Sequence, residues 1–125
     1  MSGDVRNYKD LIVWQKAVVL VKFVYGLVGR FPPYEKYGLA DQLRRSVVSI
    51  PSNIAEGQAR QYPNEFRHFL FTALGSTAEV ETQMIIAHDL SYISADELHQ
   101  LESQVVEIQK MLHALIRRLN AAPRD

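Results

Sequence analysis

The sequence predicts a single all-α domain, an antiparallel up-down four-helix bundle. Apolar residues recur at helical spacing along most of the chain, and no segment shows the sustained alternation typical of a strand. Prolines and capping residues divide the chain into four helical segments, and a length of 125 residues suits one domain. We expect the single domain to span residues 1–125, with helices at about residues 9–30, 39–59, 63–90 and 94–120.

The first predicted helix is apolar over most of its circumference and ends where Phe31-Pro32-Pro33 interrupts the backbone hydrogen bonding. One face holds Leu11, Trp14, Ala17, Val18, Val21, Tyr25 and Val28. A second set, Val13, Leu20, Val24 and Leu27, extends the apolar arc to about 200°, whereas a surface helix needs only about 100°. We therefore expect self-association through this helix, with Leu20, Val24 and Leu27 as candidate interface residues. Alternatively, long loops cover the excess apolar surface.

The second predicted helix has an apolar face and a polar face. Its inward residues are Leu39, Leu43, Val47, Ile50 and Ile54, and its polar stripe is Gln42, Arg45, Ser49, Asn53, Glu56 and Arg60. Pro51 lies inside this helix and removes an N–H that would bond to the Val47 carbonyl, so we expect a kink. Alternatively, Ser52 begins a new helix as its N-cap.

The last two predicted helices begin at local N-terminal signals. Pro63 suits the first turn of a helix, and Glu65 lies at the positive end of the helix dipole. Ser94 and Glu97 have the spacing of a capping box. The fourth helix then carries an a/d seam, which is typical of antiparallel bundles. The seam consists of Leu98, Leu101, Val105, Ile108, Leu112, Leu115 and Leu119.

Composition and charge narrow the class of protein. The chain has no cysteine, which excludes disulfides and thiolate metal sites and fits a reducing compartment. Its first residues are polar, and no apolar run reaches the roughly 20 residues of a membrane span, so we expect a soluble cytoplasmic protein. The net charge is zero, but residues 1–62 hold nine basic and five acidic residues and residues 63–125 hold the reverse. Generic nucleic-acid binders are more basic.

Residues 43–57, LRRSVVSIPSNIAEG, resemble the signature of the four-helix bundle proteins encoded in intervening sequences of bacterial 23S rRNA genes. Segments within residues 10–17, 31–42 and 65–81 resemble the same family, so the likeness covers about residues 8–119. The chain is also similar to the accessory variability determinant of diversity-generating retroelements. The resemblance implies a four-helix bundle assembled into a ring-like homo-oligomer, a pentamer. For the retroelement relative it also implies binding to nucleic acid beside a reverse transcriptase.

Basic residues of the first two predicted helices are the candidates for binding nucleic acid. Phosphate contacts from such side chains give a salt-sensitive affinity that does not depend on base sequence. The alternative is that carboxylates four residues earlier on the helix neutralise the arginines. Arg45 then pairs with Asp41, and Arg60 pairs with Glu56 in the same way. The candidate set is Lys9, Lys16, Lys22, Arg44, Arg45 and Arg60.

Few side chains suit catalysis or metal binding. Asn53 and Glu56 lie one turn apart in the signature, where they can satisfy backbone groups near Pro51, pair across a subunit interface, contact a ligand or contribute to catalysis. A di-iron bundle needs two Glu-x-x-His motifs, and residues 65–68 form the only forward match. We therefore expect no enzyme activity, no metal and no cofactor.

Two functions remain open at this point: an adaptor associated with RNA or DNA, and a structural or protein-interaction scaffold. Charge arrangement separates them. A nucleic-acid binder gathers its basic side chains on one exposed face. A scaffold pairs them with carboxylates and exposes an apolar groove for a protein partner.

Overall fold

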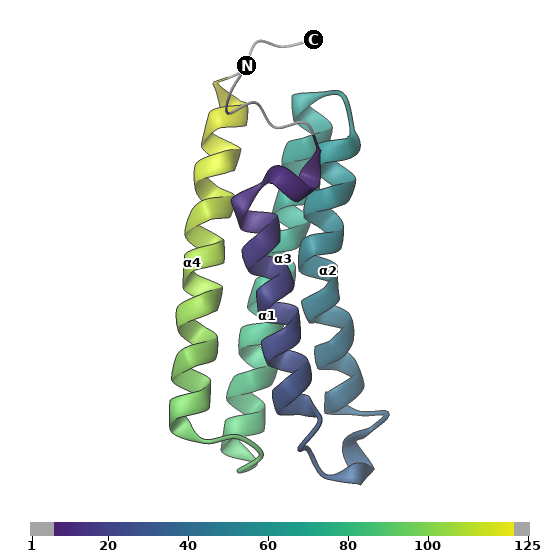
Figure 1. Cartoon of the computed structure of the whole chain (residues 1–125), viewed down its shortest axis with the longest axis vertical. Helices are drawn as coiled ribbons and strands as arrows, with labels where there is room; N and C mark the ends of the chain where they lie inside the picture. Colours follow the sequence, from purple (N-terminus) through teal and green to yellow (C-terminus); the bar gives the residue numbers. More distant parts are fainter. Residues whose placement is uncertain (1–6, 122–125) are drawn as a thin grey trace.

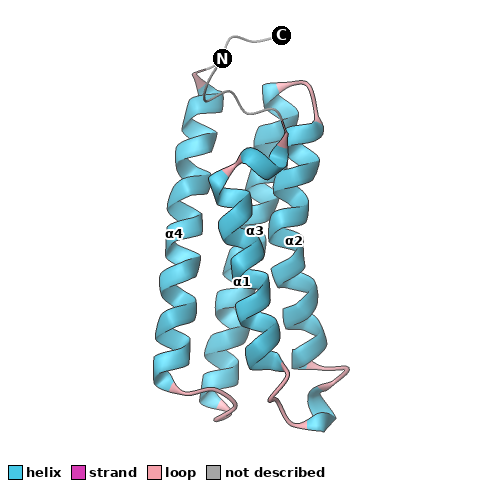
Figure 2. Ribbon diagram, viewed as in Figure 1, coloured by secondary structure: helices cyan, strands magenta, loops and turns pink. Residues whose placement is uncertain are grey.

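Four antiparallel α-helices form the bundle, and consecutive helices lie side by side (Figure 1). The computed structural model describes residues 7–121. The helices are α1 (Ile12–Val28), α2 (Leu39–Ala59), α3 (Pro63–Asp89) and α4 (Ala95–Asn120). Two short 3-10 turns, η1 (Tyr8–Asp10) and η2 (Pro33–Glu35), precede α1 and α2, and the described residues contain no strand (Figure 2). The prediction of an all-α chain with four helices is confirmed.

Each helix packs against its neighbours in sequence, and α1 also packs against α4. Helices α1 and α2 therefore form one side of the bundle, and α3 and α4 form the opposite side. Fully buried aliphatic side chains from all four helices fill the space between, each contributing about 1.5–3 kcal/mol. The largest are Leu20, Val24, Leu43, Val47, Ile50, Ile54, Leu70, Val80, Met84, Leu101, Ile108 and Leu112. Within residues 7–121, none of the helices combines the length and the hydropathy of a membrane span.

Helix α1 begins later than the sequence predicts. The Asn7 side chain accepts a hydrogen bond from the Lys9 N–H at 2.8 Å, and Asp10 accepts one from the Asn7 N–H at 3.3 Å. This capping box belongs to the 3-10 turn η1 and not to α1. Leu11 then adopts an extended backbone, which separates the turn from the helix. The predicted start near residue 9 therefore merged two elements, because both carry helix-forming residues.

Helix α2 runs without interruption through Pro51, which is buried. The proposed new helix start at Ser52 is therefore wrong. Ile50 and Ile54, on either side of the proline, are fully buried, and this burial holds the helix together despite the missing N–H. The kink at Pro51 stays a prediction.

The signature of α2 ends in a glycine that allows α3 to approach closely. A Cβ at Gly57 would lie 2.8 Å from Phe69 Cβ and 2.9 Å from Phe66 Cδ1, closer than atoms in proteins pack. It would also lie 3.2 Å from the Phe66 carbonyl oxygen, which belongs to the α3 backbone. The chain turns directly from α2 into α3, with Pro63 in the first turn of α3 as predicted. Gly57 therefore sets the distance between the two helices where they meet.

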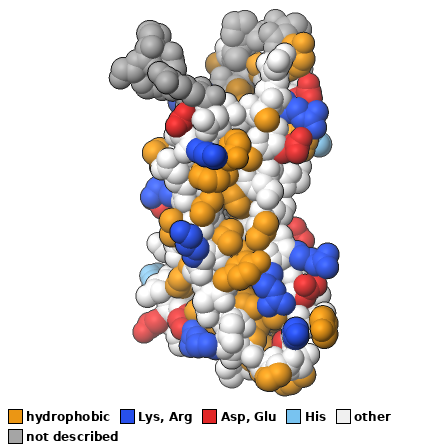
Figure 3. All heavy atoms as spheres, turned by 45° about the vertical axis from the view of Figure 1, so that its right-hand side comes forward, with side chains coloured by type: hydrophobic (Ala, Val, Ile, Leu, Met, Phe, Trp, Pro, Cys, Tyr) orange, Lys and Arg blue, Asp and Glu red, His pale blue; other side chains and the backbone are white. Residues whose placement is uncertain are grey.

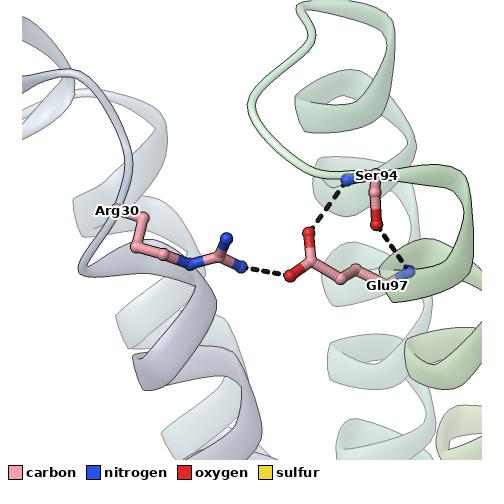
Figure 4. Close-up of polar contacts among 3 residues, drawn as sticks. All are labelled: Arg30, Ser94 and Glu97. Atoms are coloured by element: carbon pink, nitrogen blue, oxygen red, sulfur yellow. Dashed lines mark hydrogen bonds and ion pairs between the residues drawn. The ribbon is translucent and has the colours of Figure 1, made fainter.

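A capping box joins the start of α4 to the end of α1 (Figure 4). The Glu97 N–H donates to Ser94 Oγ at 3.1 Å, and the Ser94 N–H donates to Glu97 Oε1 at 2.9 Å. The second carboxylate oxygen of Glu97 forms an ion pair with Arg30, which follows α1. The Ser94 N–H, together with Arg30, lowers the pKa of Glu97. The predicted capping box is confirmed, and it also connects two helices.

Gly57 and Gly75 provide a matched pair of glycine-to-alanine changes with opposite expected signs. Gly57→Ala should destabilise the fold by about 1–3 kcal/mol, because its Cβ overlaps α3. Gly75→Ala, in the middle of α3, should stabilise by about 0.5–1 kcal/mol, because its Cβ meets no atom within 4 Å and alanine favours a helix. Urea unfolding followed by circular dichroism measures both. Equal effects from the two changes would contradict the close-approach argument.

The capping carboxylate predicts a pH-dependent contribution to stability. Because the pKa of Glu97 is lower in the folded chain than its ordinary 4.5, its contribution is complete above that pH and is lost as pH falls through the folded-state pKa. Glu97→Gln should therefore cost about 0.5 kcal/mol near pH 7, since Arg30 is largely exposed, and almost nothing near pH 3. Unfolding free energies at both pH values test this. A difference that stays constant in acid would contradict it.

Candidate functional site

The arginines predicted to bind nucleic acid are engaged within the chain. Arg45 Nε lies 3.0 Å from Asp41, and Arg60 contacts Glu56 at 2.9 Å. These are the two pairings that the sequence offered as the alternative to phosphate binding. Arg60 also contacts Glu65 of α3 at 3.2 Å, and its guanidinium lies 5.1 Å from the centre of the Phe69 ring.

The remaining basic candidates differ in their contacts. Arg44 donates to the carbonyl oxygen of Lys36 at 3.0 Å, in the loop before α2. Lys16 pairs with Glu107 of α4 at 3.2 Å, whereas Lys9 lies in η1 against the ring of Tyr8. Lys22 is exposed on α1. Phosphate binding by these six residues therefore stays a prediction, and it would have to compete with the contacts that most of them already make.

The three apolar residues proposed as interface contacts lie inside the chain's own core. Leu20 and Val24 are completely buried, and Leu27 is 5% exposed. They cannot contact another subunit while the bundle is intact, so this assignment is corrected. The reason is that α1 is apolar over more than half of its circumference, so its sequence does not reveal which side turns inward. The buried side of α1 is centred on these three residues, and its outer side is formed by the residues described next.

Apolar side chains on the outer side of α1 and on α2 form a band along the molecule (Figure 3). We call this band the α1/α2 surface. Tyr25 and Val48 are among its exposed members, at 45% and 40%. Helical geometry places Val18 and Val21 on the side of α1 that faces α2, opposite Lys16, which faces α4. Helical spacing puts Trp14 and Tyr25 on the same side of α1 as Val18 and Val21. It puts Val48 and Ala55 on the side of α2 away from Ser46 and Ser49, which bond to α3, and these six apolar residues make up the surface.

Polar residues of the signature join α2 to α3. The hydroxyls of Ser49 and Ser76 lie 2.8 Å apart, and Ser46 Oγ lies 2.6 Å from the side-chain oxygen of Gln83. Asn53 donates to the Ser49 carbonyl at 2.8 Å. A hollow of about 400 Å³ opens beside these groups, and its walls are Gln42, Arg45, Ser46, Ser49, Glu79 and Gln83. The polar positions of the signature thus serve helix packing in this chain.

The two polar interface candidates are also accounted for within α2. Asn53 is half-buried and bonds to Ser49, one turn earlier. Glu56 is exposed and pairs with Arg60. Among the described residues, no buried side-chain nitrogen or oxygen lacks a hydrogen-bond partner, and no group of three or more His, Cys, Asp or Glu side chains could hold a metal ion.

A cluster of polar side chains at the loop end of the bundle was missed by the sequence analysis. Glu35 accepts hydrogen bonds from the Leu39 N–H at 3.0 Å and from the Tyr92 hydroxyl at 2.7 Å. These two bonds, the first foremost, lower the pKa of Glu35. The Tyr92 hydroxyl also lies 3.0 Å from that of Tyr34, and both partners raise the pKa of Tyr92. The cluster fastens the loop before α2 to the loop between α3 and α4.

Comparisons with known proteins agree with this fold. The model of the 23S rRNA-intervening sequence protein family matches residues 9–114. The crystal structure of a protein with unknown function from the S23 ribosomal protein family of Bacteroides thetaiotaomicron has a similar fold, with a TM-score of 0.79 and 24% sequence identity. The likeness covers 85% of this chain and 96% of that one. None of the curated proteins compared with the sequence matches it.

The family match spans nearly all of α1 to α4 and includes the signature that packs α2 against α3. It also agrees with the resemblance that the sequence showed on residues 43–57. This chain therefore belongs to the 23S rRNA-intervening sequence protein family.

Proposed function

We propose that this chain is a non-enzymatic scaffold that assembles with copies of itself through the α1/α2 surface. The observation that carries the proposal is the apolar band in Figure 3, which runs along two helices and has no covering segment among the described residues. A contiguous band of exposed apolar side chains is typical of protein interfaces. A closed ring, such as the pentamer that the sequence resemblance implies, would bury the band in every copy.

The charge arrangement supports a scaffold over a nucleic-acid adaptor. Arg45 and Arg60 already contact carboxylates, so phosphate binding would have to replace these ion pairs. Lys16 is likewise held by Glu107 on another side of the bundle. A protein partner requires no such exchange, because the side chains of the α1/α2 surface are apolar.

Val48→Asp tests the proposal. The wild-type chain should have a mass several times the 14.3 kDa of one copy in light scattering, and the variant should have the mass of one copy. An unpaired charge buried at a protein interface costs about 3–5 kcal/mol, which is enough to separate the subunits. Ile86→Asp is the matched control, because Ile86 is similarly exposed, at 43%, but lies on α3. A wild-type mass of 14.3 kDa across a dilution series would refute self-assembly.

Binding of labelled structured RNA and DNA at low and moderate salt tests the competing function. A scaffold should show no affinity that falls steeply with salt. Binding that is strong at low salt and is weakened by Arg45→Ala would instead establish the nucleic-acid adaptor. The same buffers should be used for the mass measurements, so that assembly and binding are compared in one state.

A further inference from the structure

A second exposed apolar surface lies on the side of the bundle opposite the α1/α2 surface. Phe71 and Ile85 of α3 are 54% and 40% exposed, and Val106 of α4 is 40% exposed. Phe71 and Ile85 are 14 residues apart and so lie along one side of α3. Val106 and Glu81 of α3 line one hollow, which places Val106 beside α3. We call Phe71, Ile85 and Val106, with the residues of this hollow, the α3/α4 surface.

The two surfaces carry opposite charge. The hollow in the α3/α4 surface has a volume of about 730 Å³ and is lined by Glu81 and Glu102, by Lys110 and His99, and by Glu107, which already pairs with Lys16. The α1/α2 surface is bordered by Lys22, which has no carboxylate within ion-pair distance among the described residues. The two halves of the sequence show the same contrast, with excess basic residues before position 63 and excess acidic residues after it.

Lys22 and the acidic hollow also lie at the same level along the bundle. Lys16 of α1 contacts Glu107 of α4, and Arg30 contacts Glu97. Lys22 lies between the first members of these pairs, so it is level with the part of α4 between Glu97 and Glu107. Most of the hollow lies there. A rotation about an axis along the bundle keeps this level, so the lysine of one copy can face the hollow of the next.

We propose that the α1/α2 surface of one copy docks on the α3/α4 surface of the next, with Lys22 directed into the hollow between Glu81 and Glu102. The inference rests on the proposed self-assembly and adds the identity of the mating surface. Because the two surfaces differ, the contact is head-to-tail and each copy has two neighbours. Such contacts form a closed ring if the rotation between successive copies closes and an open filament if it does not, whereas a contact between two α1/α2 surfaces would give a two-fold dimer.

Mixing two complementary variants tests the head-to-tail contact. Val48→Asp damages the α1/α2 surface and Val106→Asp damages the α3/α4 surface, at valines of equal exposure. Each variant alone should have the mass of one copy. Their mixture should form a one-to-one pair and nothing larger, because it retains one intact surface of each kind. If Val106→Asp alone keeps the wild-type mass, the α3/α4 surface is not the mating surface and the inference is overturned.

The failures of the two proposals are distinguishable. A monomeric wild-type chain refutes self-assembly itself. A wild-type oligomer that Val48→Asp dissociates and Val106→Asp leaves intact refutes only the head-to-tail contact. Ile86→Asp, on the side of α3 that faces α2, should leave the oligomer unchanged throughout.

Charge reversal gives an independent test that leaves the apolar surfaces intact. Lys22→Glu should weaken association at least tenfold, because it places a carboxylate against Glu81 and Glu102 of the hollow. Adding Glu102→Lys to the same chain should restore most of the loss, since the pair is then reversed. Dilution series in light scattering measure both changes, and circular dichroism checks that each variant is folded. A double variant that assembles no better than Lys22→Glu alone would overturn the pairing.

Discussion

The close approach of α2 to α3 is the constraint on which the rest of the bundle depends. These helices share the most extensive contact in the molecule, and Gly57 permits it by leaving room for Phe66 and Phe69. Hydroxyl and amide side chains of the signature add hydrogen bonds along the same contact. The resulting pair presents a continuous apolar face, with Leu43 and Val80 completely buried, on which α1 and α4 pack. The contact between α2 and α3 therefore explains the residues of the signature without reference to a ligand.

Features that depend on neighbouring residues could be predicted from the sequence. The capping box of Ser94 and Glu97, and the pairing of Arg45 with Asp41, involve residues three or four positions apart, and helix geometry alone brings them together. The a/d seam of α4 is local in the same sense. Its members Leu101, Val105, Ile108, Leu112 and Leu115 are buried, as the seam predicts. The contact between Tyr92 and Glu35 spans 57 residues and was not predictable, because it depends on how two loops meet.

The orientation of α1 in the bundle could not be predicted from the sequence, for a different reason. Apolar residues cover more than half of the circumference of this helix, so a periodicity argument finds an excess of apolar surface but cannot assign its inner and outer sides. Packing against α2 and α4 decides the rotation, and it turns Leu20, Val24 and Leu27 inward. The expectation of surplus apolar surface was sound, whereas the residues chosen for it were wrong. The surplus lies on the two flanks of α1. Tyr25 and Val19 are both exposed, and helical spacing puts Tyr25 on the flank towards α2 and Val19 on the other.

The net charge of the chain is zero, but its basic and acidic side chains are distributed unevenly, and this distribution matters for assembly. Ion pairs between neighbouring helices, such as Lys16 with Glu107, neutralise part of each half. What remains is an apolar surface bordered by an exposed lysine on one side and an apolar surface around a carboxylate-rich hollow on the other. Two copies joined through like surfaces would bring like charges together, which opposes association. Joined through unlike surfaces, they bury apolar area and pair opposite charges at once. The distribution of charge therefore selects the direction of assembly, while the apolar area provides its driving force.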